Sequence, residues 1–217
     1  DTLTVTDQNG TEIKLTDKGD GTFTFTMPAS RITVKVAFKP AAFQVFTDVP
    51  SGSYYEEAVQ WAAANDITTG TDSTHFSPDG ICTRAQAVTF LWRAAGSPAP
   101  KSSAMPFTDV PAGSYYYNAV LWAVENGITK GTSDTAFSPD KTCTRAQIVT
   151  FLWRSQNAPA AGSSNPFTDV AADDYYADAV LWAVKENVTK GTGYTTFGPD
   201  DNCTRAQIVT FLWRTMA

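Results

Sequence analysis

The sequence predicts a mainly α-helical protein made of three tandem two-helix repeats, preceded by a small β-sheet unit. Residue counts point to the repeats, because the chain has three Cys and six Trp, both multiples of three. The block Cys-Thr-Arg-Ala-Gln also occurs three times, at intervals of roughly 60 residues. Only the N-terminal segment alternates polar and apolar residues in the way that is typical of strands.

Residues 1–40 form the predicted β unit. Alternating stretches at 3–6, 12–15, 22–26 and 32–36 are separated by turn residues such as Asn9-Gly10. About 40 residues is at the lower limit of what folds unaided, so we expect the end of a larger β-sandwich or a module that docks on the repeats. The segment Thr-Phe-Thr-Met-Pro-Ala-Ser before the last stretch resembles the C-terminal strands of immunoglobulin-like or similar repeats in bacterial surface proteins.

Each repeat begins at a Phe-Thr-Asp-Val motif, at Phe46, Phe107 and Phe167. A Trp, a Gly-Thr turn and a Phe-x-Pro-Asp run follow in the same order. The repeat then ends in Cys-Thr-Arg-Ala-Gln and, after one variable residue, Val-Thr-Phe-Leu-Trp-Arg. Segments rich in Ala, Ser and Pro at 95–106 and 155–166 are typical of connectors between repeats.

Two helices are predicted in each repeat. In 115–124 of the second repeat, Tyr116, Val120 and Val124 recur at every fourth position, and Asn126-Gly127 marks the helix end. The second helix starts at a capping box, in which the Thr of Thr-Arg-Ala-Gln caps the helix and the Gln reaches back to it. Apolar residues then cover nearly all sides of this helix, which indicates that it is buried.

Composition excludes several classes of protein. With 217 residues, 42% of them hydrophobic and 12% aromatic, the chain is long and apolar enough to fold. The net charge of −6 gives no general attraction for nucleic acid, so any anionic partner must be bound by local cations. No apolar stretch approaches the length of a spanning helix, so we expect no membrane insertion.

The repeated motifs together resemble the S-layer homology domain, in three copies over 43–217 (43–96, 105–156 and 165–217). The resemblance implies a pseudo-threefold helical assembly that binds secondary cell-wall polysaccharide of Gram-positive-type bacteria through pockets between repeats, often through pyruvylated N-acetylmannosamine. It also implies an extracellular location at the cell wall or S-layer surface. All three copies carry Gln where the family motif most often has Glu. Both residues close the capping box, so the change bears on the ligand rather than on the fold.

An Arg in the first turn of each second helix is the leading binding candidate. Its guanidinium presents a fork to a carboxylate, such as that of a pyruvate ketal, and the N–H groups of the helix start add partial positive charge. A sugar ring also needs an aromatic face and hydrogen-bond partners, which repeated Trp, Gly-Thr and Asp positions supply. The predicted carbohydrate-binding residues are Arg84, Arg145, Arg205, Asp48, Asp109, Asp169, Trp61, Trp122, Trp182, Gly70, Gly131, Gly191, Thr71, Thr132 and Thr192.

These candidates also have structural interpretations. Each Arg can pair with an Asp of its motif instead of a ligand, and Asp at such positions is typical of turns and caps. The Trp rings are more typical of a core than of a sugar-binding surface. Lys130 and Lys190 precede the Gly-Thr turn where the first repeat has Thr69. We expect solvent-exposed lysines here. If they contact an anionic ligand, the first site is the weakest or differs in specificity.

The Cys residues occupy one equivalent position, at Cys82, Cys143 and Cys203. We expect small buried apolar side chains rather than disulfide partners. No Cys-x-x-Cys motif occurs and His75 is the single His, to which we assign no role, so we expect no zinc site, no other metal and no cofactor. Three Cys meeting at a threefold axis are the one conceivable metal site.

We expect a monomeric, non-enzymatic cell-wall anchor. Glycoside hydrolysis needs two carboxyl groups in unequal environments, whereas no Glu or His recurs in the three repeats. Three linked sites instead favour multivalent retention on a polymer. Two alternatives stay open: a protein–protein module with a surface of Tyr pairs such as Tyr115-Tyr116, and a structural stalk of a larger extracellular enzyme.

Overall fold

The structure is a computed structural model that describes residues 2–19, 22–37 and 46–217. The chain separates into two compact units, Asp1–Ala42 and Phe43–Ala217. The expected junction between the β unit and the repeats, at 40–43, falls outside the described residues. Each unit is therefore described by itself.

The β unit consists of two antiparallel strand pairs. Strand β1 (Thr2–Asp7) pairs with β4 (Ile32–Ala37), and the two-residue strands β2 (Thr16–Asp17) and β3 (Phe23–Thr24) pair with each other. The expected strand at 12–15 is reduced to a bridge between Glu12 and Thr6, and β2 follows it. Alternation identifies which side chains share a face, but it does not supply a strand to pair with.

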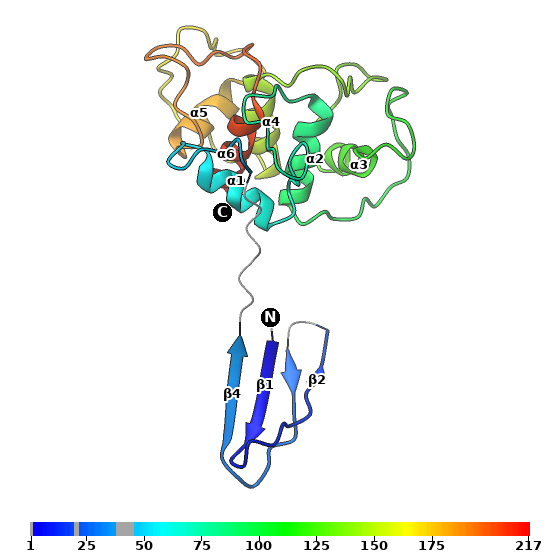
Figure 1. The fold of residues 1–217 in the computed structure, drawn as a ribbon. Helices are drawn as coiled ribbons and strands as arrows, with labels where there is room; N and C mark the ends of the chain where they lie inside the picture. The colour runs from blue at the N-terminus through cyan, green and yellow to red at the C-terminus, as the bar shows by residue number, and fades with distance from the viewer. Residues whose placement is uncertain (1, 20–21, 38–45) are drawn as a thin grey trace. The chain divides into compact units, whose positions relative to one another are not determined.

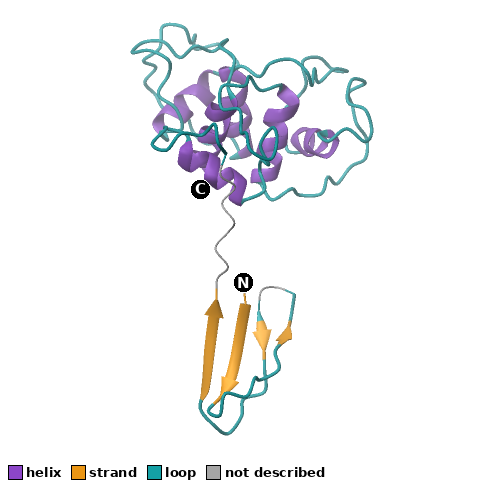
Figure 2. Ribbon diagram, viewed as in Figure 1, coloured by secondary structure: helices purple, strands orange, loops and turns teal. Residues whose placement is uncertain are grey.

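The six helices of the described repeats lie two to a repeat, as predicted (Figures 1 and 2). The first helices begin two residues later than the apolar spacing suggests, because Tyr115 and Tyr116 belong to a turn in which the Tyr117 N–H donates to the Ser114 carbonyl. The capping box is confirmed at all three second helices. The helices are α1 (Glu56–Ala64), α2 (Arg84–Ala94), α3 (Tyr117–Glu125), α4 (Arg145–Ser155), α5 (Ala177–Lys185) and α6 (Arg205–Met216).

The helices pack between repeats rather than within them. Helix α3 packs on α2, α5 packs on α4, and α1 of the first repeat packs on α6 of the third. The second helices α2, α4 and α6 contact one another in the middle of the helical unit (Figure 1). This cyclic exchange closes a pseudo-threefold ring inside one chain, which confirms the predicted fold class.

Backbone hydrogen bonds close the same ring at the Cys positions. The N–H of Cys82 donates to the Cys203 carbonyl at 3.0 Å, that of Cys203 to Cys143 at 2.9 Å, and that of Cys143 to Cys82 at 2.8 Å. The three thiols are free and fully buried. Burial raises the pKa of Cys82 and of Cys203 to about 12. The described residues contain no group of three or more His, Cys, Asp or Glu able to hold a metal ion.

Two further properties of the described residues bear on function. Among the β-unit side chains that the structure describes, only Val5 is buried, so this unit has little core of its own. None of the helices in the described parts of the chain is both long enough and apolar enough to cross a membrane.

The exchange of helices predicts that damage to the third repeat opens the first. Leu212 of α6 is fully buried, so Leu212→Ala should lower the free energy of unfolding by about 2–5 kcal/mol. Hydrogen exchange should accelerate in α1 as much as in α6. Tyr194→Ala, at a fully exposed side chain, is the control. Unchanged protection of α1 in the Leu212 variant would contradict the interlocked packing.

The buried thiols predict a second result. Because the thiolate is the reactive form and burial raises the pKa of these groups, the native chain should give no reaction with a thiol reagent at pH 8. The same chain in guanidinium chloride should give three equivalents. Rapid modification of the native chain would show that the Cys ring opens readily.

Candidate functional site

The Asp of each Phe-Thr-Asp-Val motif joins two loops of its own repeat. The Asp109 carboxylate accepts hydrogen bonds from the N–H groups of Phe137 at 2.8 Å and Ser138 at 2.7 Å. Asp48 and Asp169 make the equivalent pairs of bonds. These carboxylates therefore hold the Phe-x-Pro-Asp loop in place.

That loop in turn holds an Arg from the preceding repeat. The Nε of Arg84 donates to the Phe137 carbonyl at 2.9 Å, and its guanidinium carbon lies 4.8 Å from the Phe137 ring centre and 5.5 Å from that of Phe151. Only 3% of Arg84 is exposed. Arg145 and Arg205 donate in the same way to the carbonyls of Phe197 and Phe76, so the three Arg contacts follow the ring.

Among the described residues these buried Arg residues form no ion pair within 4.0 Å, although Asp109, Asp169 and Asp48 interact with Arg84, Arg145 and Arg205 electrostatically at longer range. In the parts of the chain that the structure describes, ion pairs shorter than 4.0 Å join only His75 to Asp72 and Lys185 to Glu186. The structural alternative of an Arg–Asp salt bridge is therefore wrong for these three positions. Burial lowers the pKa of the Arg84 guanidinium, and its Nη2 has no hydrogen-bond partner. A buried cation in this state is stabilised by an anion that supplies the missing acceptor.

The helix start does not contribute N–H groups to a ligand, contrary to expectation. The N–H of Arg84 donates to the Lys141 carbonyl at 2.8 Å, and that of Ala85 to the Pro139 carbonyl at 3.0 Å. The Gln86 N–H donates to the Thr83 hydroxyl of the capping box. The guanidinium of Arg84, rather than the helix backbone, is thus the group that keeps an unmade hydrogen bond, at the buried Nη2.

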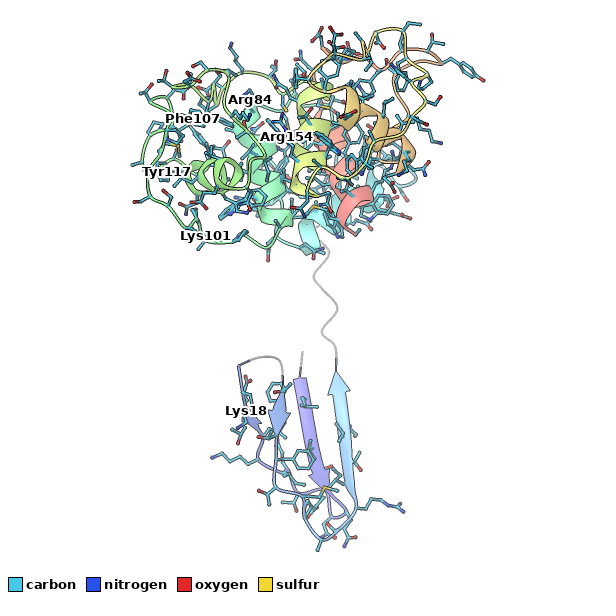
Figure 3. All side chains as sticks on the ribbon, turned by 180° about the vertical axis from the view of Figure 1, so that it is seen from behind. Lys18, Arg84, Lys101, Phe107, Tyr117 and Arg154 are labelled. Carbon is cyan, nitrogen blue, oxygen red and sulfur yellow. The ribbon has the colours of Figure 1, made fainter. Side chains whose placement is uncertain are left out.

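Arg84 lines a cavity of about 370 Å³, which we call the second-repeat groove. Figure 3 labels Arg84 and Arg154, two of the residues that line it. Residues of all three repeats form it, because Arg84 comes from the first repeat, Tyr175 from the third and the remainder from the second. Tyr175 is 61% exposed, and its ring packs edge-on against Tyr176 at 4.9 Å. The lining residues are Arg84, Thr129, Lys130, Gly131, Thr132, Gln147, Thr150, Phe151, Arg154 and Tyr175.

An equivalent cavity of about 270 Å³, the first-repeat groove, has the same construction. Here the Arg comes from the third repeat and the Tyr from the second. The lining residues are Thr68, Thr69, Gly70, Gln86, Thr89, Phe90, Arg93, Tyr115 and Arg205. Each of the two grooves thus requires all three repeats, and neither is lined by an Asp or a Glu.

The third repeat brings the corresponding residues together. Arg145 donates through Nη2 to the Thr189 hydroxyl at 3.3 Å. Burial raises the pKa of Tyr54, and the charge of Arg214 opposes that increase, so these two groups are neighbours. Arg145 also interacts electrostatically with Tyr54.

The structure separates the sequence-predicted residues into those that line the two described grooves and those that do not. Gly70, Gly131 and Thr132 line the grooves with Arg84 and Arg205. The other set lies elsewhere: the three Asp bind backbone N–H groups, Trp122 and Trp182 are buried, and Trp61 packs against the core. In the same set, the hydroxyl groups of Thr71 and Thr192 donate to the carbonyls of His75 and Thr196 in their own turns. Trp182 borders a different cavity, beside Gln156 and Arg214.

Gly131 has a structural requirement of its own. Its φ is +82°, and a Cβ there would lie 2.5 Å from both the Ala136 carbonyl oxygen and Cε1 of Phe107. Only Gly tolerates this backbone and this contact. Its place in the groove therefore does not by itself indicate contact with a ligand.

Sequence reasoning missed the second Arg of each groove. Arg93 and Arg154 end the repeated Val-Thr-Phe-Leu-Trp-Arg block and line the grooves about two helical turns beyond the Gln of the capping box. The sequence feature that could have identified them is an Arg that recurs near the end of an otherwise apolar helix in all three repeats. Tyr115 and Tyr175 were considered only as a protein-contact surface, whereas each lies in a separate groove.

The fold and the grooves define a three-repeat helical module with cation-lined grooves between its repeats. The sequence pattern of the S-layer homology domain matches residues 45–88, 106–149 and 166–209. The chain therefore belongs to the S-layer homology domain family.

Known relatives are much longer proteins. The chain is 28% identical over 204 residues to the surface-layer 125 kDa protein of Lysinibacillus sphaericus. The aligned region covers 92% of this chain and 17% of that protein. It is 30% identical over 179 residues to an endoglucanase of Bacillus sp. (strain KSM-635), and the alignment covers 78% of this chain and 19% of the endoglucanase. It is 24% identical over 194 residues to the S-layer protein of Bacillus thuringiensis subsp. finitimus, covering 88% and 23%. The chain thus spans about a fifth of each relative.

Family membership establishes the general role. S-layer homology domains are non-catalytic modules that anchor surface proteins to the cell wall by binding cell-wall polymers, and enzymes that contain them carry them as separate domains. The chain is accordingly an extracellular module of the cell surface.

The Asp contacts predict a loss of stability. Asp109→Ala leaves the N–H groups of Phe137 and Ser138 without their acceptor, which should cost about 1–3 kcal/mol for each that stays buried. Asp140→Ala, at an exposed Asp of the neighbouring loop, should be nearly neutral. Denaturant unfolding measures both. Equal stability of the two variants would show that Asp109 does not hold the loop.

Proposed function

We propose that the chain anchors its parent protein by binding a carboxylate-bearing amino sugar of secondary cell-wall polysaccharide, such as a pyruvylated N-acetylmannosamine unit, in the grooves between repeats. The observation that carries the proposal is Arg84, which lines the second-repeat groove: its buried guanidinium has no carboxylate of the described residues within 4.0 Å, and its Nη2 is unpaired. A ligand carboxylate would provide that acceptor.

The remaining groove residues match a sugar. Tyr175 offers an exposed aromatic face, and Thr132 offers an exposed hydroxyl at the groove. Thr129 and Thr150 are buried, and their hydroxyl groups already accept from the Gly131 N–H and donate to the Ala146 carbonyl, respectively. At about 370 Å³ the second-repeat groove falls within the usual range of small-ligand sites, near its lower end. These features support one sugar unit with its substituent rather than a long oligosaccharide.

Charge supports selection of a discrete anion. The whole chain carries a net charge of −6, yet the lining of each described groove contains two Arg residues and no carboxyl group. A chain of this kind repels bulk polyanions and admits a carboxylate only at the grooves. Linked grooves then raise retention on a repetitive polymer without requiring a tight single site.

We infer that the chain acts as a monomer. The exchange of first helices between repeats is closed within the chain, because α1 packs on α6. Each first helix of the described repeats packs on a second helix of the same chain, which supports a monomer. Light scattering should give the mass of one chain.

Cell-wall co-sedimentation tests the proposal. The chain should bind purified bacterial walls and should lose that binding after hydrofluoric acid removes the wall polysaccharide. Binding that survives extraction would contradict the proposal and would favour peptidoglycan or a protein as the partner.

Groove residues are tested by two variants of equal charge. The triple change Arg93→Gln, Arg154→Gln and Arg214→Gln removes the second Arg of each repeat, and the loss of charged hydrogen bonds worth about 1.5–3 kcal/mol each should weaken binding at least tenfold. The control changes Lys101, Lys141 and Lys185 to Gln, at exposed positions outside both grooves. Circular dichroism verifies folding. Equal weakening in both would indicate non-specific electrostatics.

A further inference from the structure

We propose that the second-repeat groove takes a sugar unit carrying a phosphate as well as a carboxylate, and that Lys130 sets this preference over the first-repeat groove. The inference rests on the proposed function. It starts from one difference between the two grooves: the residue before the Gly-Thr turn is Lys130 in the second repeat and the uncharged Thr69 in the first.

The carboxylate position is the buried Arg. In the second-repeat groove, Nη2 of Arg84 has no hydrogen-bond partner, although only 3% of this residue is exposed to solvent. In the first-repeat groove, Nη2 of Arg205 donates to the Thr68 hydroxyl at 3.4 Å. An incoming acceptor therefore satisfies an orphan donor in one groove and competes with a weak internal bond in the other.

The second anionic position lies at the rim of the same groove. Arg154 is half-buried, and its Nη1 donates to the Ile128 carbonyl at 3.2 Å. Lys130 follows Ile128 by two residues, is exposed and also lines the groove. Arg154 is thus bonded to the backbone only two residues before Lys130, and both side chains line the same groove. No lining residue of this groove carries a negative charge.

A phosphate suits this pair of cations. Near neutral pH a phosphate ester carries up to two negative charges, and it accepts paired hydrogen bonds from Arg while Lys acts as a point charge. The first-repeat groove retains Arg205 and Arg93 but has no third cation. Its smaller cavity, about 270 Å³ against about 370 Å³, also leaves less room for a second substituent.

Site-resolved titration of the full chain tests the inference. The probes are the methyl glycoside of 4,6-O-pyruvylated N-acetylmannosamine and the 1-phosphate of the same sugar. Amide NMR signals of Gly70 and Gly131 report separately on the first- and second-repeat grooves. At Gly131 the phosphate probe should bind at least tenfold more tightly than the glycoside, whereas at Gly70 the two probes should differ much less.

The matched variants exchange the residue before the Gly-Thr turn between the first and second repeats. Lys130→Thr should abolish the preference at Gly131, and Thr69→Lys should create one at Gly70. Lys190→Thr, with the same change of charge in the third repeat, should leave Gly131 unaffected. Equal binding of both probes at Gly131, or a preference that survives Lys130→Thr, overturns the inference and leaves the proposed function intact. Binding of neither probe at either groove overturns both.

Discussion

The cyclic donation of backbone and Arg hydrogen bonds from one repeat to the next is the constraint on which this structure depends. Each Cys N–H donates to the preceding Cys carbonyl around the ring, and each Arg Nε donates to a Phe carbonyl of the following repeat. Because α1 also packs on α6, the third repeat completes the first. Among the described helices no repeat therefore has a helix pair of its own, and the first N–H groups of each second helix find their acceptors in the next repeat.

The grooves follow from the same constraint. Each described groove takes its buried Arg from one neighbour and its Tyr from the other, so the groove is a property of the ring rather than of a single repeat. The ring places three guanidiniums between Phe rings, where cation–π contact and a backbone carbonyl offset part of the cost of burial. No carboxylate of the described residues lies within 4.0 Å of them, so an anionic ligand would provide the direct ion pair.

Much of this was accessible from the sequence, since repetition and local signals determine it. The capping box at Thr83 and the Arg beside it were read directly from a motif that occurs three times. The packing of each first helix on the second helix of another repeat could not be predicted from the sequence. Because the repeats are nearly identical, a first helix could pack equally well on the second helix of its own repeat or of a neighbour. Arg154 was missed for a related reason: its role arises only when a Tyr and an Arg of other repeats meet it in space. The alternating residues at 12–15 predicted a strand, but the alternation could not show whether a neighbouring strand was available to pair with it, and only a bridge at Glu12 forms.

A crystal structure of the chain bound to a pyruvylated fragment of wall polysaccharide would test the central claim most directly. The account predicts the ligand carboxylate on Nη2 of Arg84, with the sugar ring against Tyr175 in the second-repeat groove. A fragment bound instead in the cavity beside Trp182, with Arg84 unchanged, would contradict it.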